Sequence, residues 1–240
     1  MIDWIRKNYD NPSVEIGGEI LPVAIRRHPS AKRMVLRLAP DGREVRLTMP
    51  RWGRTSEAMD FIHSRTDWLE AQHAKTERVA PPSPGGSIAH RGEYLTIDWS
   101  PLNSRAPQID GTSIRVGGPE ASLPGRLEKW LRAQATDLMS GDLAEYCAAA
   151  GKIAPELKLS RAQRRWGSCS ESGAVRINWR LIMAPDEVRR SVVAHEVAHL
   201  VHFDHSPAFH RFLGDIFEGD IDAANSWLKR HGRSLYRNFG

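Results

Sequence analysis

The residues best suited to chemistry are histidines that cluster toward the C-terminus. Five of the ten histidines lie between residues 195 and 210, and residues 195–199 read H-E-V-A-H. If this stretch is helical, His195 and His199 lie on one face a turn apart and can bind one metal ion, while Glu196 approaches a water molecule. The spacing therefore predicts a zinc site with His195 and His199 as ligands and Glu196 as the general base of a hydrolysis reaction.

Three histidines are candidates for the third ligand, namely His202, His205 and His210. On a straight helix, positions 195 and 202 are roughly 10.5 Å apart along the axis, too far for both side chains to share one metal ion. A turn after residue 203, followed by a second helix from residue 206, would instead bring His205 back to the metal. We therefore expect one Zn²⁺ per chain, with His205 as third ligand and an open fourth position.

The elements that must position these residues can be predicted from periodicity and turn residues. Pro185 and two acidic residues begin the helix that carries the motif, and a hairpin is expected over residues 157–183 with Gly173 in its turn. A helix or broken helix pair should follow Pro124. Nearer the N-terminus we expect the following elements: a hairpin within residues 23–49 that turns at residues 40–42, a helix over residues 55–69, a linker at residues 79–87, and strands at residues 94–99 and 113–116.

The composition limits the class of protein. The chain has 240 residues, a net charge of +5 and two cysteines, too few for a disulfide framework. We find no secretory signal and no apolar run long enough to cross a membrane, so we expect a soluble, cytoplasmic protein with no membrane partner. Residues 21–54 carry nine Lys or Arg against Asp41 and Glu44. This stretch is either a solvated strand face or a surface that binds nucleic acid.

Three sequence segments together resemble one protein family. They are RRWGSCS at residues 164–170, INWRLIMAP at residues 177–185 and VVAHEVAHLVHFDHSPAF at residues 192–209. These segments resemble the YgjP-like metallopeptidases, bacterial zincins related to the SprT and WLM proteases, and the resemblance extends over residues 125–235 and into the basic segment. It implies a proteolytic fold with His195, His199 and His205 as metal ligands and Glu196 as the catalytic residue.

Four further residues are candidates for contacts with the substrate. Trp166 and Gly167 belong to the expected hairpin, whose edge could receive an extended peptide, and Gly167 would allow close backbone approach. A packed tryptophan in an ordinary turn is the alternative. His202 replaces the glycine of the zinc-protease pattern H-E-x-x-H-x-x-G-x-x-H, and His210 stands where the resemblance leads us to expect a large aromatic residue. Each of these two histidines is otherwise an exposed or packed side chain.

These observations predict an α+β protein. A basic, mostly β N-terminal region would occupy residues 1–120, and a zincin-like metallopeptidase domain, with a hairpin and several helices, would occupy residues 121–240. The expected reaction is zinc-dependent hydrolysis of a protein or peptide. The alternatives are a nucleic-acid-associated protein recruited by residues 21–54, and a non-catalytic zinc site closed by a fourth protein ligand.

Overall fold

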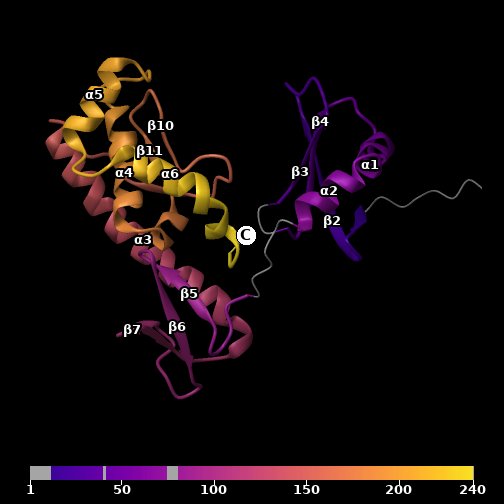
Figure 1. Cartoon of the computed structure of the whole chain (residues 1–240), viewed down its shortest axis with the longest axis horizontal. Helices are drawn as coiled ribbons and strands as arrows, with labels where there is room; N and C mark the ends of the chain where they lie inside the picture. The colour runs from indigo at the N-terminus through magenta and orange to yellow at the C-terminus, as the bar shows by residue number, and fades with distance from the viewer. Residues whose placement is uncertain (1–11, 40–41, 75–80, 240) are drawn as a thin grey trace, which may run out of the picture. The chain divides into compact units, whose positions relative to one another are not determined.

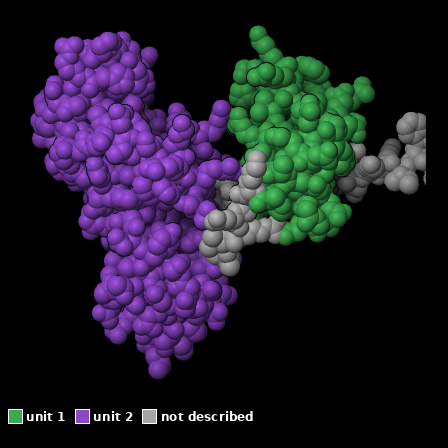
Figure 2. Space-filling model, viewed as in Figure 1, with its two compact units in different colours: residues 1–79, 240 green, residues 80–239 purple. Residues whose placement is uncertain are grey.

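The computed structural model describes residues 12–39, 42–74 and 81–239 and divides into two compact units. The first contains residues 1–79 with residue 240, and the second contains residues 80–239 (Figure 2). The two compact units divide between residues 79 and 80. The domain boundary expected between residues 120 and 121 stays a prediction. None of the helices in the described part of the chain combines the length and apolar character that a membrane crossing requires.

Unit 1 is a four-stranded sheet packed against two helices (Figure 1). Its elements are β1 (Ser13–Ile16), β2 (Glu19–His28), β3 (Val35–Leu38), β4 (Val45–Pro50), α1 (Thr55–His63) and α2 (Thr66–Ala74). The strand order is β1-β2-β4-β3, with β2 parallel and β3 antiparallel to β4. The predicted hairpin is thus confirmed, with Leu36 opposite Leu47, although residues 40–41 of its turn lie outside the described residues.

The core of unit 1 follows from the alternation of apolar residues along β4. Val45, Leu47 and Met49 are fully buried and pack with Ile62 and Leu69 of the helices. The helix expected over residues 55–69 is two helices, because the chain leaves the first helix after residue 63 and starts the second at residue 66. Ile62 and Leu69 nevertheless both reach the core.

Unit 2 begins with a second four-stranded sheet, of order β5-β6-β8-β7. Its strands are β5 (Ser87–His90), β6 (Glu93–Trp99), β7 (Gln108–Asp110) and β8 (Ser113–Val116). The two strands predicted in this region are confirmed as β6 and β8, which pair in parallel. Ile88, Ile97 and Ile114 of this sheet are buried in the same hydrophobic cluster as Leu127 and Leu131 of the following helix. This sheet therefore shares its core with the C-terminal helices.

The remainder of unit 2 is a small sheet surrounded by helices. Its elements are η1 (Glu120–Ser122), α3 (Leu123–Ala149), β9 (Lys158–Ser160), β10 (Gly167–Cys169), β11 (Val175–Asn178), η2 (Trp179–Met183), α4 (Asp186–Ala198), α5 (Pro207–Ile216), α6 (Ile221–His231) and η3 (Gly232–Tyr236). The helix after Pro124 is one continuous helix, α3. The predicted hairpin is confirmed for β10 and β11, and Gly173 in its turn has φ 79°, whereas the beginning of the expected first strand is β9, which pairs in parallel with β11. The last part of the expected second strand is instead η2. The chain is therefore α+β.

Candidate metal centre

Helix α4 carries the first two site residues and is buried on most of its surface. Val192, Val193, Val197 and Ala198 belong to the core, and α4 contacts α3, α5, α6 and both strands of the hairpin. Such packing fixes the rotation of the helix about its axis, because turning it would expose the apolar residues. With this rotation Glu196 is only 5% exposed, while His195 is partly exposed.

The three predicted ligands lie together. Nε2 of His195 lies 3.2 Å from Nε2 of His199 and 3.3 Å from Nε2 of His205, and one ligand atom from each residue lies within 4.8 Å of the others. Nitrogens bound to zinc at about 2.0–2.1 Å in a tetrahedron are about 3.3 Å apart, so these separations fit a zinc ion. His205 is exposed, which leaves the group open on one side.

His205 reaches this position because helix α4 ends sooner than expected. The helix stops at Ala198, before the turn that the sequence placed after residue 203, and the backbone N–H of His202 still donates to the carbonyl of Ala198. Helix α5 then starts as predicted, with Ser206 as its N-cap. Among the described residues, Arg91 is the one non-glycine with positive φ, so His202 occupies its place in the turn without requiring glycine.

A backbone contact of His202 orients His199, one of the predicted ligands. Nδ1 of His199 lies 3.1 Å from the carbonyl oxygen of His202. A carbonyl oxygen can only accept, so Nδ1 carries the proton and Nε2 keeps the lone pair that a metal needs. The imidazole of His202 instead lies near Phe212, with ring centroids 5.7 Å apart. His202 therefore acts on the site through its backbone.

Phe209 supports all three histidines, a role that its apolar character alone did not reveal. Its ring is fully buried, and its centroid lies 5.0, 4.6 and 4.9 Å from those of His195, His199 and His205. A rigid ring beneath three imidazoles limits their rotation. The signal available in the sequence was its position, because Phe209 lies in the first turn of the helix that starts just after His205.

The surroundings of the three histidines favour the neutral forms of His195 and His199 and raise the pKa of Glu196. Burial, with smaller contributions from the other histidines, lowers the pKa of His195 to about 4, and burial also lowers the pKa of His199. Burial raises the pKa of Glu196 to about 7, although the charge of Arg165 and the backbone of Cys169 act in the opposite direction. Neutral imidazoles and a carboxyl group that exchanges protons near neutrality suit a hydrolytic centre.

The other candidate residues differ in how close they lie to Glu196 and the three histidines. Gly167 lies directly against the acid, because a Cβ built on it would be 2.3 Å from Oε1 of Glu196. Trp166 packs instead on Tyr236, with ring centroids 5.6 Å apart. His210 is exposed, and its ring lies 6.3 Å from that of His205. Gly167 and His210 are therefore beside the site, whereas Trp166 packs against the C-terminal segment.

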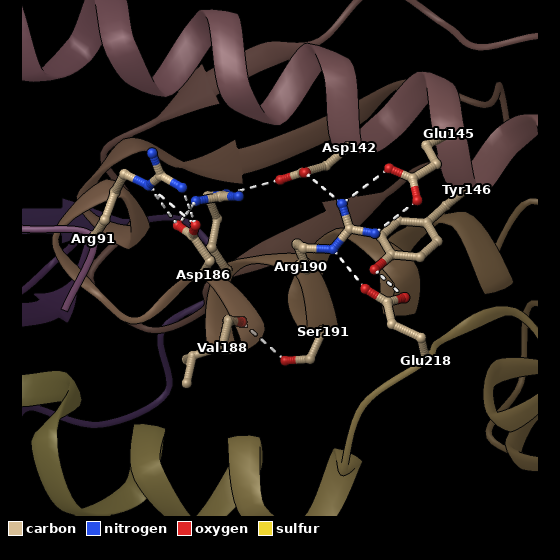
Figure 3. Close-up of polar contacts among 10 residues, drawn as sticks. Arg91, Asp142, Glu145, Tyr146, Asp186, Val188, Arg190, Ser191 and Glu218 are labelled. Carbon is tan, nitrogen blue, oxygen red and sulfur yellow. Dashed lines mark hydrogen bonds and ion pairs between the residues drawn. The ribbon is translucent and has the colours of Figure 1, made fainter.

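Buried ion pairs that the sequence did not reveal hold α4 against α3. Nε of Arg189 donates to Asp142 at 2.8 Å, and both side chains are almost fully buried, at 3% and 7% exposure. The neighbouring Arg190 donates to Asp142, Glu145 and Glu218, which surround its guanidinium (Figure 3). These contacts fix the start of α4 and leave its last turn free to carry the histidines.

Comparison with known proteins adds a family assignment to this geometry. The sequence model described as YgjP-like, metallopeptidase domain, matches residues 32–231. No curated protein and no solved structure was found to match the chain. The family match includes part of unit 1 and nearly all of unit 2, with the three histidines and Glu196 inside it. The chain therefore belongs to the YgjP-like metallopeptidase-domain family.

Proposed function

We propose that this chain is a zinc-dependent peptidase in which His195, His199 and His205 hold the metal and Glu196 is the general base. The convergence of three imidazole nitrogens beside a buried carboxyl group carries the proposal. In the described residues this metal-binding group has three members, which is the number typical of catalytic zinc sites, whereas structural sites have four. The geometry therefore favours a catalytic over a structural role.

A zinc ion held by His195, His199 and His205 would supply Lewis acidity, which would acidify water and polarise a carbonyl group. Glu196 takes the proton of the attacking water and passes it to the leaving amine, so that the carboxyl group ends the cycle in its starting state. Its buried position beside Gly167 holds it in one orientation during both transfers. The nearby neutral histidines keep their lone pairs available to the metal.

Strand β10 is suited to align an extended substrate. It is at the edge of its three-stranded sheet, of order β10-β11-β9, and it contacts α4. A peptide that pairs with such an edge receives main-chain hydrogen bonds that do not depend on its sequence. Because Gly167 begins this strand and lies against Glu196, a paired peptide would present its backbone near the acid.

The substitution Glu196→Gln tests this proposal. The amide keeps the shape of the side chain but cannot accept a proton, so we expect about one zinc ion per chain, as in the wild type, and a loss of activity of about 10²–10⁴-fold. Zinc is measured by atomic absorption and hydrolysis with fluorescein-labelled casein. Wild-type activity in a fully folded, zinc-loaded Glu196→Gln protein would refute the assignment of Glu196.

The nucleic-acid alternative has less support from the structure. Within the basic stretch at residues 21–54, Nη2 of Arg27 donates to the hydroxyl of Thr55 at 2.8 Å, and Arg46 is paired with Glu44. The ion pair with Glu44 thus balances one of these positive charges inside unit 1, and the contact with Thr55 holds the guanidinium of Arg27 against α1.

A further inference from the structure

Unit 1 contains a groove that the proposed peptidase mechanism does not use. Its volume is about 450 Å³, within the range of ligand sites. It is lined by Met34, Val35 and Leu36 at or just before the start of β3, and by Phe61 of α1 and Trp68 of α2. Trp68 is 43% exposed, a large apolar surface left in contact with water. An apolar groove of this size is suited to receive a side chain from another molecule.

The groove follows the free edge of a β-sheet. In the described part of the chain β3 pairs only with β4, so it forms one edge of the sheet. Successive side chains of a strand point to opposite faces. Nevertheless, Val35 and Leu36, which are consecutive residues of β3, both line the groove, together with residues 33 and 34 just before the strand. The groove therefore runs along the edge of β3, where an edge strand presents unpaired N–H and C=O groups.

Two arginines give the groove a positive charge. Arg33 and Arg65 line it, and the guanidinium carbon of Arg65 lies 5.7 Å from the centroid of the Phe61 ring. Neither guanidinium forms an ion pair with a carboxylate in the residues that the structure describes. A ligand that carries carboxylates beside an apolar group would complement both properties of the groove.

We propose that unit 1 binds an extended acidic peptide, which adds to β3 as a further strand, places an apolar side chain against Phe61 and Trp68, and pairs its carboxylates with Arg33 and Arg65. Such a peptide is a segment of a protein to be cleaved, and this substrate role rests on the proposed peptidase function. The binding itself does not rest on that function. The groove is formed by residues of unit 1 alone, whereas the proposed metal ligands belong to unit 2.

The lining favours a peptide over a single-stranded nucleic acid. Nucleic-acid sites combine stacking aromatic rings with a positively charged track for successive phosphates. Here Met34, Val35 and Leu36 provide aliphatic surface and a strand edge, and the positive charge comes from two side chains. Main-chain pairing with an edge strand and a pocket for an apolar side chain are the features by which peptides are recognised.

Binding is tested with the full chain carrying Glu196→Gln, so that the probe is not cleaved. The probe is a fluorescein-labelled peptide, Glu-Asp-Val-Leu-Val-Asp-Glu, followed by fluorescence anisotropy near physiological salt. We expect saturable binding with and without zinc. The double variant R33E/R65E should weaken binding at least about tenfold, because two exposed ion pairs become repulsive. Trp68→Ala should weaken it about fivefold by removing apolar contact.

Matched controls separate this proposal from general attraction between charges. Arg51→Glu changes an exposed arginine of unit 1 outside the groove and should leave the affinity within about twofold of the parent, because salt screens distant charges. A peptide with lysine in place of its acids, and one with N-methylated valine and leucine, should both bind at least about tenfold more weakly. Circular dichroism confirms that each variant is folded.

Three results would overturn the proposal. The first is a dissociation constant above about 1 mM for the acidic peptide. The second is unchanged affinity in R33E/R65E. The third is tighter binding of a single-stranded oligothymidylate that Arg51→Glu weakens as much as R33E/R65E does, which would identify a nucleic-acid surface. Failure of hydrolysis in the wild type, with peptide binding retained, would instead reject only the peptidase function.

Discussion

The contact between Gly167 and Glu196 allows a direct test of how the proposed general base is positioned. In Gly167→Ala the new Cβ would lie 2.3 Å from Oε1, 2.6 Å from Cγ and 2.7 Å from Cδ of Glu196. Gly167 does not have positive φ, so the backbone itself accepts alanine, and this steric overlap is the perturbation. Relief of the overlap requires that the carboxyl group or strand β10 move.

The size of the effect follows from these distances. Ordinary contact at about 3.4 Å or more requires a displacement of about 1 Å, and a misplacement of this size in a catalytic group costs on the order of 10²-fold in rate. This corresponds to about 2.7 kcal/mol in the activation free energy. Overpacking of the site should also lower the free energy of unfolding by about 1–3 kcal/mol. Zinc content should be unchanged, because the three histidines are not displaced directly.

The assay compares kcat and KM for a quenched fluorescent peptide in the wild type, in Gly167→Ala and in a control, Gly141→Ala. Gly141 lies in helix α3, and a Cβ there meets no atom within 4 Å. The control should keep full activity and gain roughly 0.5–1 kcal/mol in stability. If Gly167→Ala retains kcat within about threefold of the wild type while folded and zinc-loaded, the inferred role of this contact in positioning Glu196 is wrong.

Three further predictions concern the metal ligands and the support of the site. His205→Ala should lose most of its zinc affinity, whereas His202→Ala should keep it, because the backbone carbonyl at position 202 remains. Equilibrium dialysis measures the zinc affinity of both variants, and equal affinities would contradict the prediction. Phe209→Ala should lower the free energy of unfolding, measured in urea, by about 3–5 kcal/mol and should reduce zinc affinity about 10–100-fold. A loss of stability below about 1 kcal/mol would argue against the packing role of Phe209. Burial raises the pKa of Asp186, but the hydrogen bonds and charges of Arg91, between β5 and β6, and Arg189 of α4 have the larger effect, so this pKa lies below its usual value. Its ionised form therefore stabilises the fold above about pH 4, and this stability is lost as the pH falls through the lowered pKa. In Asp186→Asn the midpoint of urea unfolding should fall less steeply with decreasing pH below about pH 4 than in the wild type. An unchanged pH dependence would exclude this contribution.

Local periodicity was sufficient to predict the part of the site carried by one helix. His195, Glu196 and His199 lie within one turn of each other, so their relation depends on backbone hydrogen bonds between near neighbours. The start of α5 at Ser206 was predictable for the same reason, because a serine N-cap followed by proline satisfies the first turn locally. His205 could be inferred by elimination, although the place where α4 ends could not.

The tertiary structure alone decided the contacts that complete the site, because they join residues far apart in the sequence. Gly167 is brought to Glu196 by the packing of β10 on α4, and Arg189 is paired with Asp142 by the packing of α4 on α3. The same long-range packing places strands β5–β8 in the core of unit 2, although the sequence pattern grouped them with the preceding strands in one mostly β region. Burial of apolar surface drives these arrangements and has no direction along the chain, so spacing in the sequence does not reveal which distant faces meet. The three proposed ligand positions could be predicted from helical spacing and a turn, whereas the packing that buries Glu196 and holds the imidazoles follows from the tertiary structure.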